Sequence, residues 1–279
     1  MSMKHVFVEL HGVSAGSKAF LSTNKLADTA LVFVHGFTGD PIRTWKDFPG
    51  IADIKAHLLH WTTSDLYFFN YQDATKSIDD SSDDLERFLN KVYPSPVDVV
   101  EDSCNRVKKQ PQGTPIRYSR LILVGHSEGG VVIRACIAEL GKRLYAHSAS
   151  SPILGARVVL FAPALFGFLP TNWLGLLCQI FPLKQLIDLA TTWSIPAAEM
   201  RDVRTLDQVR EINEKLWCDF PEHEAFIAHV VFGENEAVVR RQRYLQDHKY
   251  PAVKGKDHGS VCKPNSEYQE PLPFVMGAD

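Results

Sequence analysis

The chain has 279 residues, is 45% hydrophobic and 23% charged, and carries a net charge of −3 at pH 7. This composition is typical of a soluble globular protein with a substantial core, and it gives no electrostatic basis for binding nucleic acid. The five cysteines are odd in number and widely spaced, which argues against a disulfide framework and a thiolate metal site; they are Cys104, Cys136, Cys178, Cys218 and Cys262.

The cysteine usage favours a reducing compartment, so the sequence predicts a cytoplasmic protein. The N-terminal apolar run contains Glu9, which is not typical of the apolar core of a signal peptide. No apolar stretch is long enough to predict a transmembrane helix.

Six short runs rich in β-branched and aromatic residues are predicted as strands, at residues 5–10, 30–35, 66–71, 120–125, 156–162 and 227–233. Helices are predicted at 77–93, which starts with capping residues, and at 128–144, with Gly141 near its C-terminal end. Several strands are apolar on both faces, which is typical of a parallel sheet covered by helices on each side. The sequence therefore predicts an α/β fold in a single domain of residues 1–279.

Residues 164–203 do not fit this alternation of strands and helices. The segment is rich in Leu, Phe and Trp, and Pro170, Pro182 and Pro196 divide it into short helical pieces. It either packs its apolar faces against the main core or forms a helical cap or lid that binds an apolar group of a substrate. A cap would also offer a transient contact with a membrane surface.

Residues 121–132, LILVGHSEGGVV, predict a strand, a sharp turn and a helix. Gly125, Ser127 and Gly129 match the pattern Gly-x-Ser-x-Gly, in which the glycines allow a tight turn and leave the serine exposed at its tip. We interpret Ser127 as a nucleophile rather than a simple turn serine. The backbone N–H of Glu128, at the start of the helix, is then one donor of an oxyanion hole.

A second marker lies upstream, where a predicted strand ends in His35 and Gly36. A glycine at this point lets the backbone approach a substrate oxygen, and the N–H of Phe37 is the candidate for the second oxyanion donor. We interpret His35 as a structural histidine that fixes the loop, because the catalytic base follows the nucleophile and the acid in the chain order of this arrangement.

The chain resembles an α/β-hydrolase, and within that superfamily the lipase-like serine esterases. The resemblance rests on residues 32–45 (VFVHGFTGDPIRTW), 68–72 (FFNYQ), 121–134 (LILVGHSEGGVVIR) and 256–264 (KDHGSVCKP). The matching segments extend over most of the predicted domain. The resemblance implies the α/β-hydrolase fold and a serine hydrolase; no metal or other cofactor is predicted.

His258 is the predicted general base, because it lies late in the chain in a loop of small residues. His248 is the alternative, but its surroundings indicate the end of a charged helix. His223 and His229 are too far apart in sequence to bind one zinc ion from a single helix face, so no metal is implied.

The acid of the triad is expected after the strand that follows the cap, within residues 230–239. Members of the superfamily usually have an aspartate there, and Glu236 occupies its position, with Glu234 as the alternative acid. Asp257 is a poor candidate, because it is adjacent to His258 in sequence. The order Ser127, Glu236, His258 is the order expected for the fold.

These residues predict a serine hydrolase that cleaves carboxylic esters through an acyl-enzyme intermediate, acting on a small-molecule or lipid ester. Three alternatives remain: a lipase that acts on lipid substrates through the apolar cap, a thioesterase or amidase, and a non-catalytic binding module with the same fold.

Overall fold

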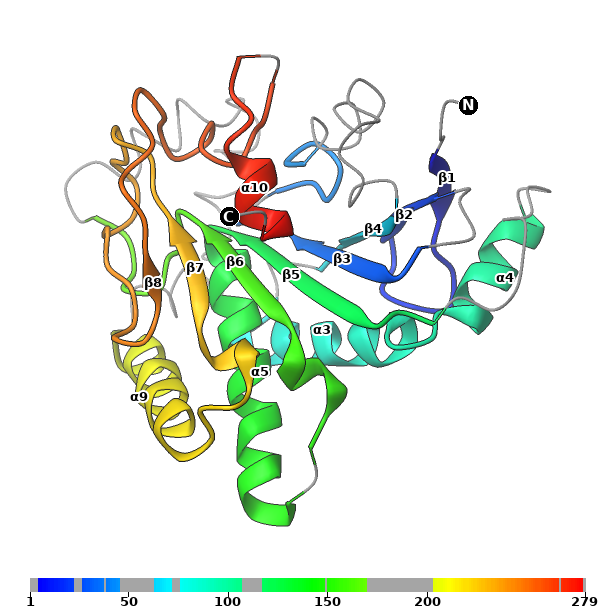
Figure 1. Cartoon of the computed structure of the whole chain (residues 1–279), viewed down its shortest axis with the longest axis horizontal. Helices are drawn as coiled ribbons and strands as arrows, with labels where there is room; N and C mark the ends of the chain where they lie inside the picture. Colours follow the sequence, from blue (N-terminus) through cyan, green and yellow to red (C-terminus); the bar gives the residue numbers. More distant parts are fainter. Residues whose placement is uncertain are drawn as a thin grey trace.

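The computed structural model describes residues 5–22, 27–37, 39–45, 63–71, 76–106, 117–148, 150–169, 203–265 and 267–277. Within them, an eight-stranded sheet has the order β1-β2-β4-β3-β5-β6-β7-β8 (Figure 1). The first two strands, β1 (His5–Glu9) and β2 (Lys18–Ser22), pair antiparallel with each other, and β2 pairs antiparallel with β4. The remaining strands are parallel: β3 (Thr29–Val34), β4 (Ser64–Phe69), β5 (Arg120–His126), β6 (Arg157–Phe161), β7 (Ala228–Val231) and β8 (His248–Lys249).

The central strands are buried on both faces, which explains their continuous apolar sequences. Every residue of β3 and β4 is buried, and so is every residue of β5 after Arg120. Burying a large apolar side chain contributes roughly 1.5–3 kcal/mol, so these strands are the main source of stability in the core. All six predicted strands are present, and the predicted mostly parallel α/β sheet is confirmed.

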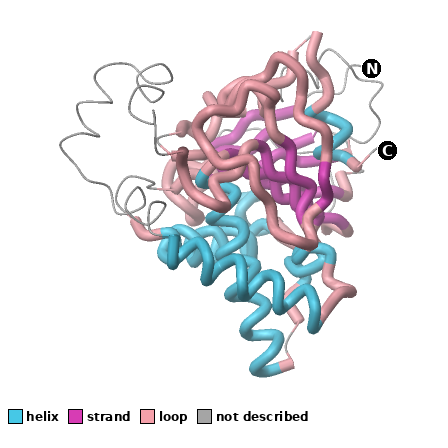
Figure 2. Tube along the Cα trace, turned by 90° about the vertical axis from the view of Figure 1, so that its left-hand side faces the viewer, coloured by secondary structure: helices cyan, strands magenta, loops and turns pink. Residues whose placement is uncertain are grey.

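The helices gather in a layer against one side of the sheet (Figure 2). This layer contains α3 (Ile78–Val92), α5 (Glu128–His147) and α9 (Val203–Asp219), while α10 (Pro271–Met276) lies on the other side (Figure 1). The shorter α4 (Val97–Arg106) follows α3, and two 3-10 turns, Pro152–Gly155 and Glu224–Phe226, precede β6 and β7. Helices therefore lie on both faces of the sheet, as predicted.

The start of α3 illustrates how local sequence determines a helix boundary. Ser77 accepts a hydrogen bond from the N–H of Asp80, and the Asp80 carboxylate accepts one from the N–H of Ser77. This reciprocal capping box satisfies donors that a helix start otherwise leaves unpaired. The apolar face that follows, with Leu85 and Phe88 among its members, is buried as the sequence predicts.

The helix predicted at 128–144 is present as α5 and ends three residues later, at His147. Gly141 packs against α9, where a Cβ would lie 2.3 Å from Cδ1 of Leu216. One prediction about a helix is wrong. The segment before His248 is not helical, and His248 belongs to the two-residue strand β8. Its side chain stacks on His229 of β7, with ring centroids 4.5 Å apart.

A buried ion pair ties α5 to the segment between β7 and β8. Arg134 binds Asp247, and both side chains are fully buried. Arg134 also donates to the main-chain oxygen of Phe226, while Asp247 accepts from the N–H of Ala228. Because a buried charge is costly without its partner, this pair keeps the start of β7 and the approach to β8 in a defined place against α5.

Most of the predicted cap at 164–203 lies outside the described residues, which include only 164–169 and 203 of it. Within the described part, Phe168 forms an isolated antiparallel bridge with Val239, and Leu169 donates to the main-chain oxygen of Val238. Among the helices that the structure describes, none is long and apolar enough to cross a membrane.

Candidate active site

Ser127 lies at a sharp turn between β5 and α5. Its backbone has φ 54° and ψ −121°, a conformation that residues with a side chain rarely adopt. The turn fits because its neighbours lack side chains: a Cβ at Gly129 would lie 2.4 Å from the carbonyl oxygens of Val34 and His35. The strand, turn and helix predicted from the sequence are therefore present, and the turn is strained at the serine itself.

The loop after β3 lies directly against this turn. A Cβ at Gly36 would lie 2.7 Å from Cβ of Ser127, so only a glycine allows the two backbones to come this close. Phe37, which follows, is buried. The oxyanion roles of the Phe37 and Glu128 N–H groups stay predictions, but both groups belong to backbones that meet at Ser127.

The side chain of His35 is held by contacts with its own loop and with Tyr71. Its Nδ1 lies 2.9 Å from the main-chain oxygen of Gly36, its ring stacks on Tyr71, and the Tyr71 hydroxyl donates to the main-chain oxygen of His35. Burial lowers the pKa of His35, so the ring is neutral near pH 7. These contacts agree with a structural histidine.

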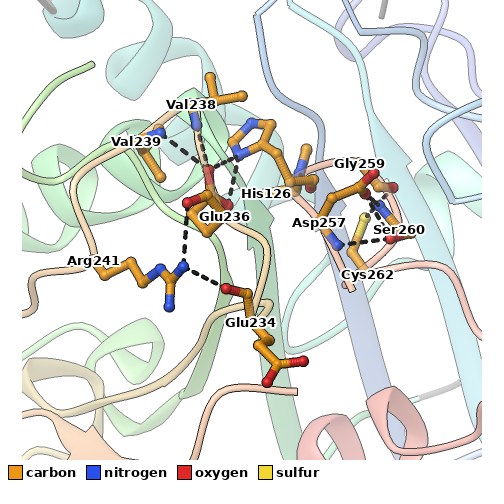
Figure 3. Close-up of polar contacts among 11 residues, drawn as sticks. His126, Glu234, Glu236, Val238, Val239, Arg241, Asp257, Gly259, Ser260 and Cys262 are labelled. Atoms are coloured by element: carbon orange, nitrogen blue, oxygen red, sulfur yellow. Dashed lines mark hydrogen bonds and ion pairs between the residues drawn. The ribbon is translucent and has the colours of Figure 1, made fainter. Parts of the chain in front are cut away.

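His258 and Glu236 form a buried hydrogen-bonded pair. Nδ1 of His258 lies 3.0 Å and 3.1 Å from the two carboxylate oxygens of Glu236. The Glu236 side chain is fully buried, and its Oε1 also accepts from the N–H groups of Val238 at 2.8 Å and Val239 at 3.0 Å (Figure 3). A carboxylate in this position fixes the ring so that Nδ1 carries a proton and Nε2 is available as a base.

Opposing effects act on the Glu236 carboxyl group. Burial alone raises its pKa, but the hydrogen bond and charge of His258, with the N–H groups of Val239 and Val238, outweigh burial and lower the pKa below its usual value. Glu236 is therefore ionised at neutral pH.

The carboxylates of Glu234 and Asp257 bind other partners than His258. The Glu234 carboxylate points away from Glu236 and accepts from the N–H of Gly255 at 2.9 Å (Figure 3). Asp257 accepts from the N–H and hydroxyl of Ser260 at 2.9 Å and 2.6 Å. Of the three carboxylates that the sequence offers, the structure brings Glu236 into contact with His258.

The segments that carry Glu236 and His258 are joined by their backbones. Gly233 and Val253 form a parallel bridge that extends the pairing of β7 with β8, and the N–H of Asn235 donates to the main-chain oxygen of Lys256 at 2.8 Å. A Cβ at Gly233 would lie 2.3 Å from that oxygen, so this approach also requires glycine. Glu236 and His258 therefore hold a defined spacing.

His126 is a member of the site that the sequence analysis did not identify. Its Nε2 lies 2.8 Å from the main-chain oxygen of His258, and the two rings lie 4.8 Å apart between centroids. Burial, assisted by the nearby His258, lowers the pKa of His126 to about 3. Its place in the sequence, next to Ser127 and at the end of a buried strand, is the signal that could have found it.

All these groups gather at one edge of the sheet because parallel strands end there together. His35 to Phe37 follow β3, Ser127 follows β5, Glu236 follows β7 and His258 follows β8. Ligand sites in open α/β sheets lie at this carboxyl edge. Among the residues that the structure describes, no three His, Cys, Asp or Glu side chains gather in a way that could hold a metal ion.

The chain is similar to known proteins in structure but matches none in sequence. No family model and no curated protein matches the chain. It aligns with esterase B of Lactobacillus rhamnosis at 11% identity and a TM-score of 0.51, over 99% of this chain and 84% of that one. It aligns with a carboxylesterase of the thaumarchaeon Nitrososphaera gargenis at 13% identity and a TM-score of 0.50, over 97% and 100%. A phospholipase of Legionella pneumophila, PlaB, aligns at 16% identity and a TM-score of 0.42. The alignment covers 74% of this chain and 38% of the length of PlaB. The first two likenesses confirm the predicted α/β-hydrolase fold.

Proposed function

We propose that this α/β-hydrolase-fold protein is a serine hydrolase that cleaves carboxylic esters with Ser127, His258 and Glu236. The observation that carries the proposal is the buried bond between His258 Nδ1 and the Glu236 carboxylate, at the sheet edge where Ser127 lies in a strained turn. A base oriented by a buried carboxylate, at the same sheet edge as a serine in such a turn, fits the arrangement that nucleophilic acyl transfer uses.

In the first half of the reaction, Ser127 Oγ attacks the ester carbonyl carbon while His258 Nε2 takes the hydroxyl proton. The new C–O bond converts the carbonyl oxygen to an oxyanion, which the N–H groups of Phe37 and Glu128 stabilise. His258 then gives its proton to the leaving alcohol oxygen as the ester C–O bond breaks, which leaves an acyl group on Ser127.

In the second half, water replaces the alcohol. His258 takes a proton from water, whose oxygen attacks the acyl carbon, and returns the proton to Ser127 as the carboxylic acid leaves. Glu236 stays ionised throughout and stabilises the imidazolium that forms in each half. Each oxyanion donor contributes about 2.7–4 kcal/mol to lowering the barrier.

The position of Ser127 between β5 and the Gly36 loop gives the proposal its geometric support. Ser127 has φ 54°, and the backbone of Gly36 comes so close that a Cβ there would lie 2.7 Å from Cβ of Ser127. The cap predicted at 164–203 is part of the proposal as the element that would shape the acyl pocket. Among its described residues, Phe168 forms a bridge with Val239.

Hydrolysis of a panel of acyl esters with graded chain lengths, with thioester, amide and micellar lipid substrates included, tests the proposal. We expect ester hydrolysis by the wild type, and a loss of about 10⁴–10⁶-fold in kcat for Ser127→Ala with its fold intact. Ser119→Ala, which changes an exposed serine before β5, is the matched control and should behave as wild type. Near-normal turnover by Ser127→Ala, or no turnover of any substrate by the wild type, would contradict the proposal.

A further inference from the structure

His126 connects the proposed nucleophile to the proposed base. It directly precedes Ser127 at the end of β5, so its backbone moves with the strained turn. Its side chain contacts the peptide of His258, with Nε2 2.8 Å from the main-chain oxygen. One residue therefore shares a backbone with the nucleophile and holds the backbone of the base.

The direction of this hydrogen bond follows from its partners. A carbonyl oxygen only accepts, so Nε2 of His126 carries the hydrogen and donates it. Burial lowers the pKa of His126 to about 3, which keeps the ring neutral near pH 7 and leaves a lone pair on Nδ1. His126 therefore has a single tautomer.

The loop around His258 is otherwise held by the segment of the acid, by contacts within the loop, and by Tyr268, whose hydroxyl donates to the main-chain oxygen of Val261. Gly233 pairs with Val253, Asn235 donates to Lys256, and Asp257 closes a turn with Ser260. These contacts set the spacing between Glu236 and His258, but they come from segments that do not include Ser127. The hydrogen bond from His126 joins the loop of the base to the residue that precedes the nucleophile.

We propose that His126 is a positioning residue that sets the distance between Ser127 and His258 through its hydrogen bond to the main-chain oxygen of His258. This inference rests on the proposed function, and His126 acts through His258 rather than on the substrate. Loss of the donor leaves a buried carbonyl oxygen unpaired, so the loop shifts to find another partner. A shift of about 1 Å in a reacting group costs on the order of 10²-fold in rate.

Two amide variants test the role, because they differ in reach and little else. His126→Gln places an N–H donor where Nε2 lies, whereas the shorter His126→Asn does not reach the carbonyl oxygen. We expect His126→Gln to keep kcat within about threefold of wild type and His126→Asn to lose about 10–100-fold, each with little change in KM. Near-ultraviolet circular dichroism and thermal midpoints establish that each variant is folded.

His126→Phe, which keeps ring volume without the donor, decides the matter if the asparagine variant does not fold; we expect the same loss of kcat. Equal kcat values in the glutamine variant and the donor-free variant would overturn the positioning role. The role predicts that the N–H of glutamine, which reaches the carbonyl oxygen, restores kcat, whereas a purely structural histidine predicts no such rescue. If the wild type is active and all variants equal it, the positioning role alone fails. Inactive wild-type protein would overturn the proposed function as well.

Discussion

Replacing Glu236 with glutamine changes one oxygen for an NH2 group at the centre of the site. In the native structure Oε1 lies 2.8 Å and 3.0 Å from two backbone nitrogens, while Oε2 lies 3.0 Å from Nδ1 of His258. The amide oxygen of the introduced glutamine must replace Oε1, because an NH2 there would face two N–H donors. The NH2 then lies where Oε2 was, 3.0 Å from Nδ1, and donates to it. This favours the neutral tautomer with its proton on Nε2, which cannot accept the proton of Ser127, over the tautomer that keeps a proton on Nδ1.

We expect Glu236→Gln to lower kcat by about 10³–10⁴-fold, which corresponds to about 4–5.5 kcal/mol in activation free energy. KM should stay within about threefold, because the substrate does not contact this buried group. The assay is steady-state ester hydrolysis, with circular dichroism to confirm an unchanged fold.

Glu234→Gln is the matched control, because it makes the same change two residues away, on an exposed carboxylate that bonds to the N–H of Gly255. We expect it to keep kcat within about threefold, since an amide oxygen can still accept that bond. If Glu236→Gln kept more than a tenth of the activity, or if Glu234→Gln were the more damaging change, the assignment of the acid would be refuted.

Other substitutions probe the close approach at Gly36, the strain at Ser127 and the buried ring of His126. Gly36→Ala should lower kcat/KM by about 10²-fold, because its Cβ would lie 2.7 Å from Cβ of Ser127. Gly155→Ala is the control and should be neutral, because a Cβ there meets no atom within 4 Å. Equal kinetics in the two variants would contradict the close approach. Ser127→Gly should be inactive, but its free energy of unfolding in urea should exceed that of Ser127→Ala by about 1 kcal/mol, because glycine relieves the strain at φ 54°. Equal stabilities of the two variants would argue against strain. The pKa of His126 is lowered from 6.5 to about 3, so the unfolded state binds more protons between these pH values and stability falls as the pH is lowered below 6.5. The loss of unfolding free energy due to this group approaches about 1.4 kcal/mol per pH unit. The unfolding free energy of His126→Gln should therefore decline less steeply than that of the wild type from about pH 6.5 to about pH 4.5. Identical slopes would count against a neutral buried ring.

The central sheet could be predicted from sequence because its strands are buried on both faces. Runs such as 30–35 and 120–125 are short, largely apolar and contain valine and isoleucine, which is typical of strands in a covered parallel sheet. The strand β8 was missed because His248 and Lys249 are exposed and polar, and two residues at a sheet edge carry no apolar pattern. The turn at Ser127 was predicted because its signal is local: the glycines, the serine and the flanking strand and helix are contiguous.

Contacts between distant residues could not be predicted in the same way. The sequence left Glu234 and Glu236 as alternatives, because it does not show in which direction each side chain of the loop points. In the structure Glu236 contacts His258, whereas Glu234 accepts from the N–H of Gly255. The helix α9 was missed although Leu206 and Val209 begin a helical spacing. Asn213 interrupts that spacing with a polar side chain, and its amide is buried against the main-chain oxygen of Arg134.

Covalent labelling by a fluorophosphonate probe tests the central claim most directly, because the probe reacts with a serine only where a base and an oxyanion hole activate it. We expect the folded wild type to gain the mass of one adduct, located at Ser127 by peptide mapping. Ser127→Ala should gain none, and Glu236→Gln should react much more slowly than Glu234→Gln. A folded wild-type protein that gains no adduct, or gains it at another serine, would contradict the account.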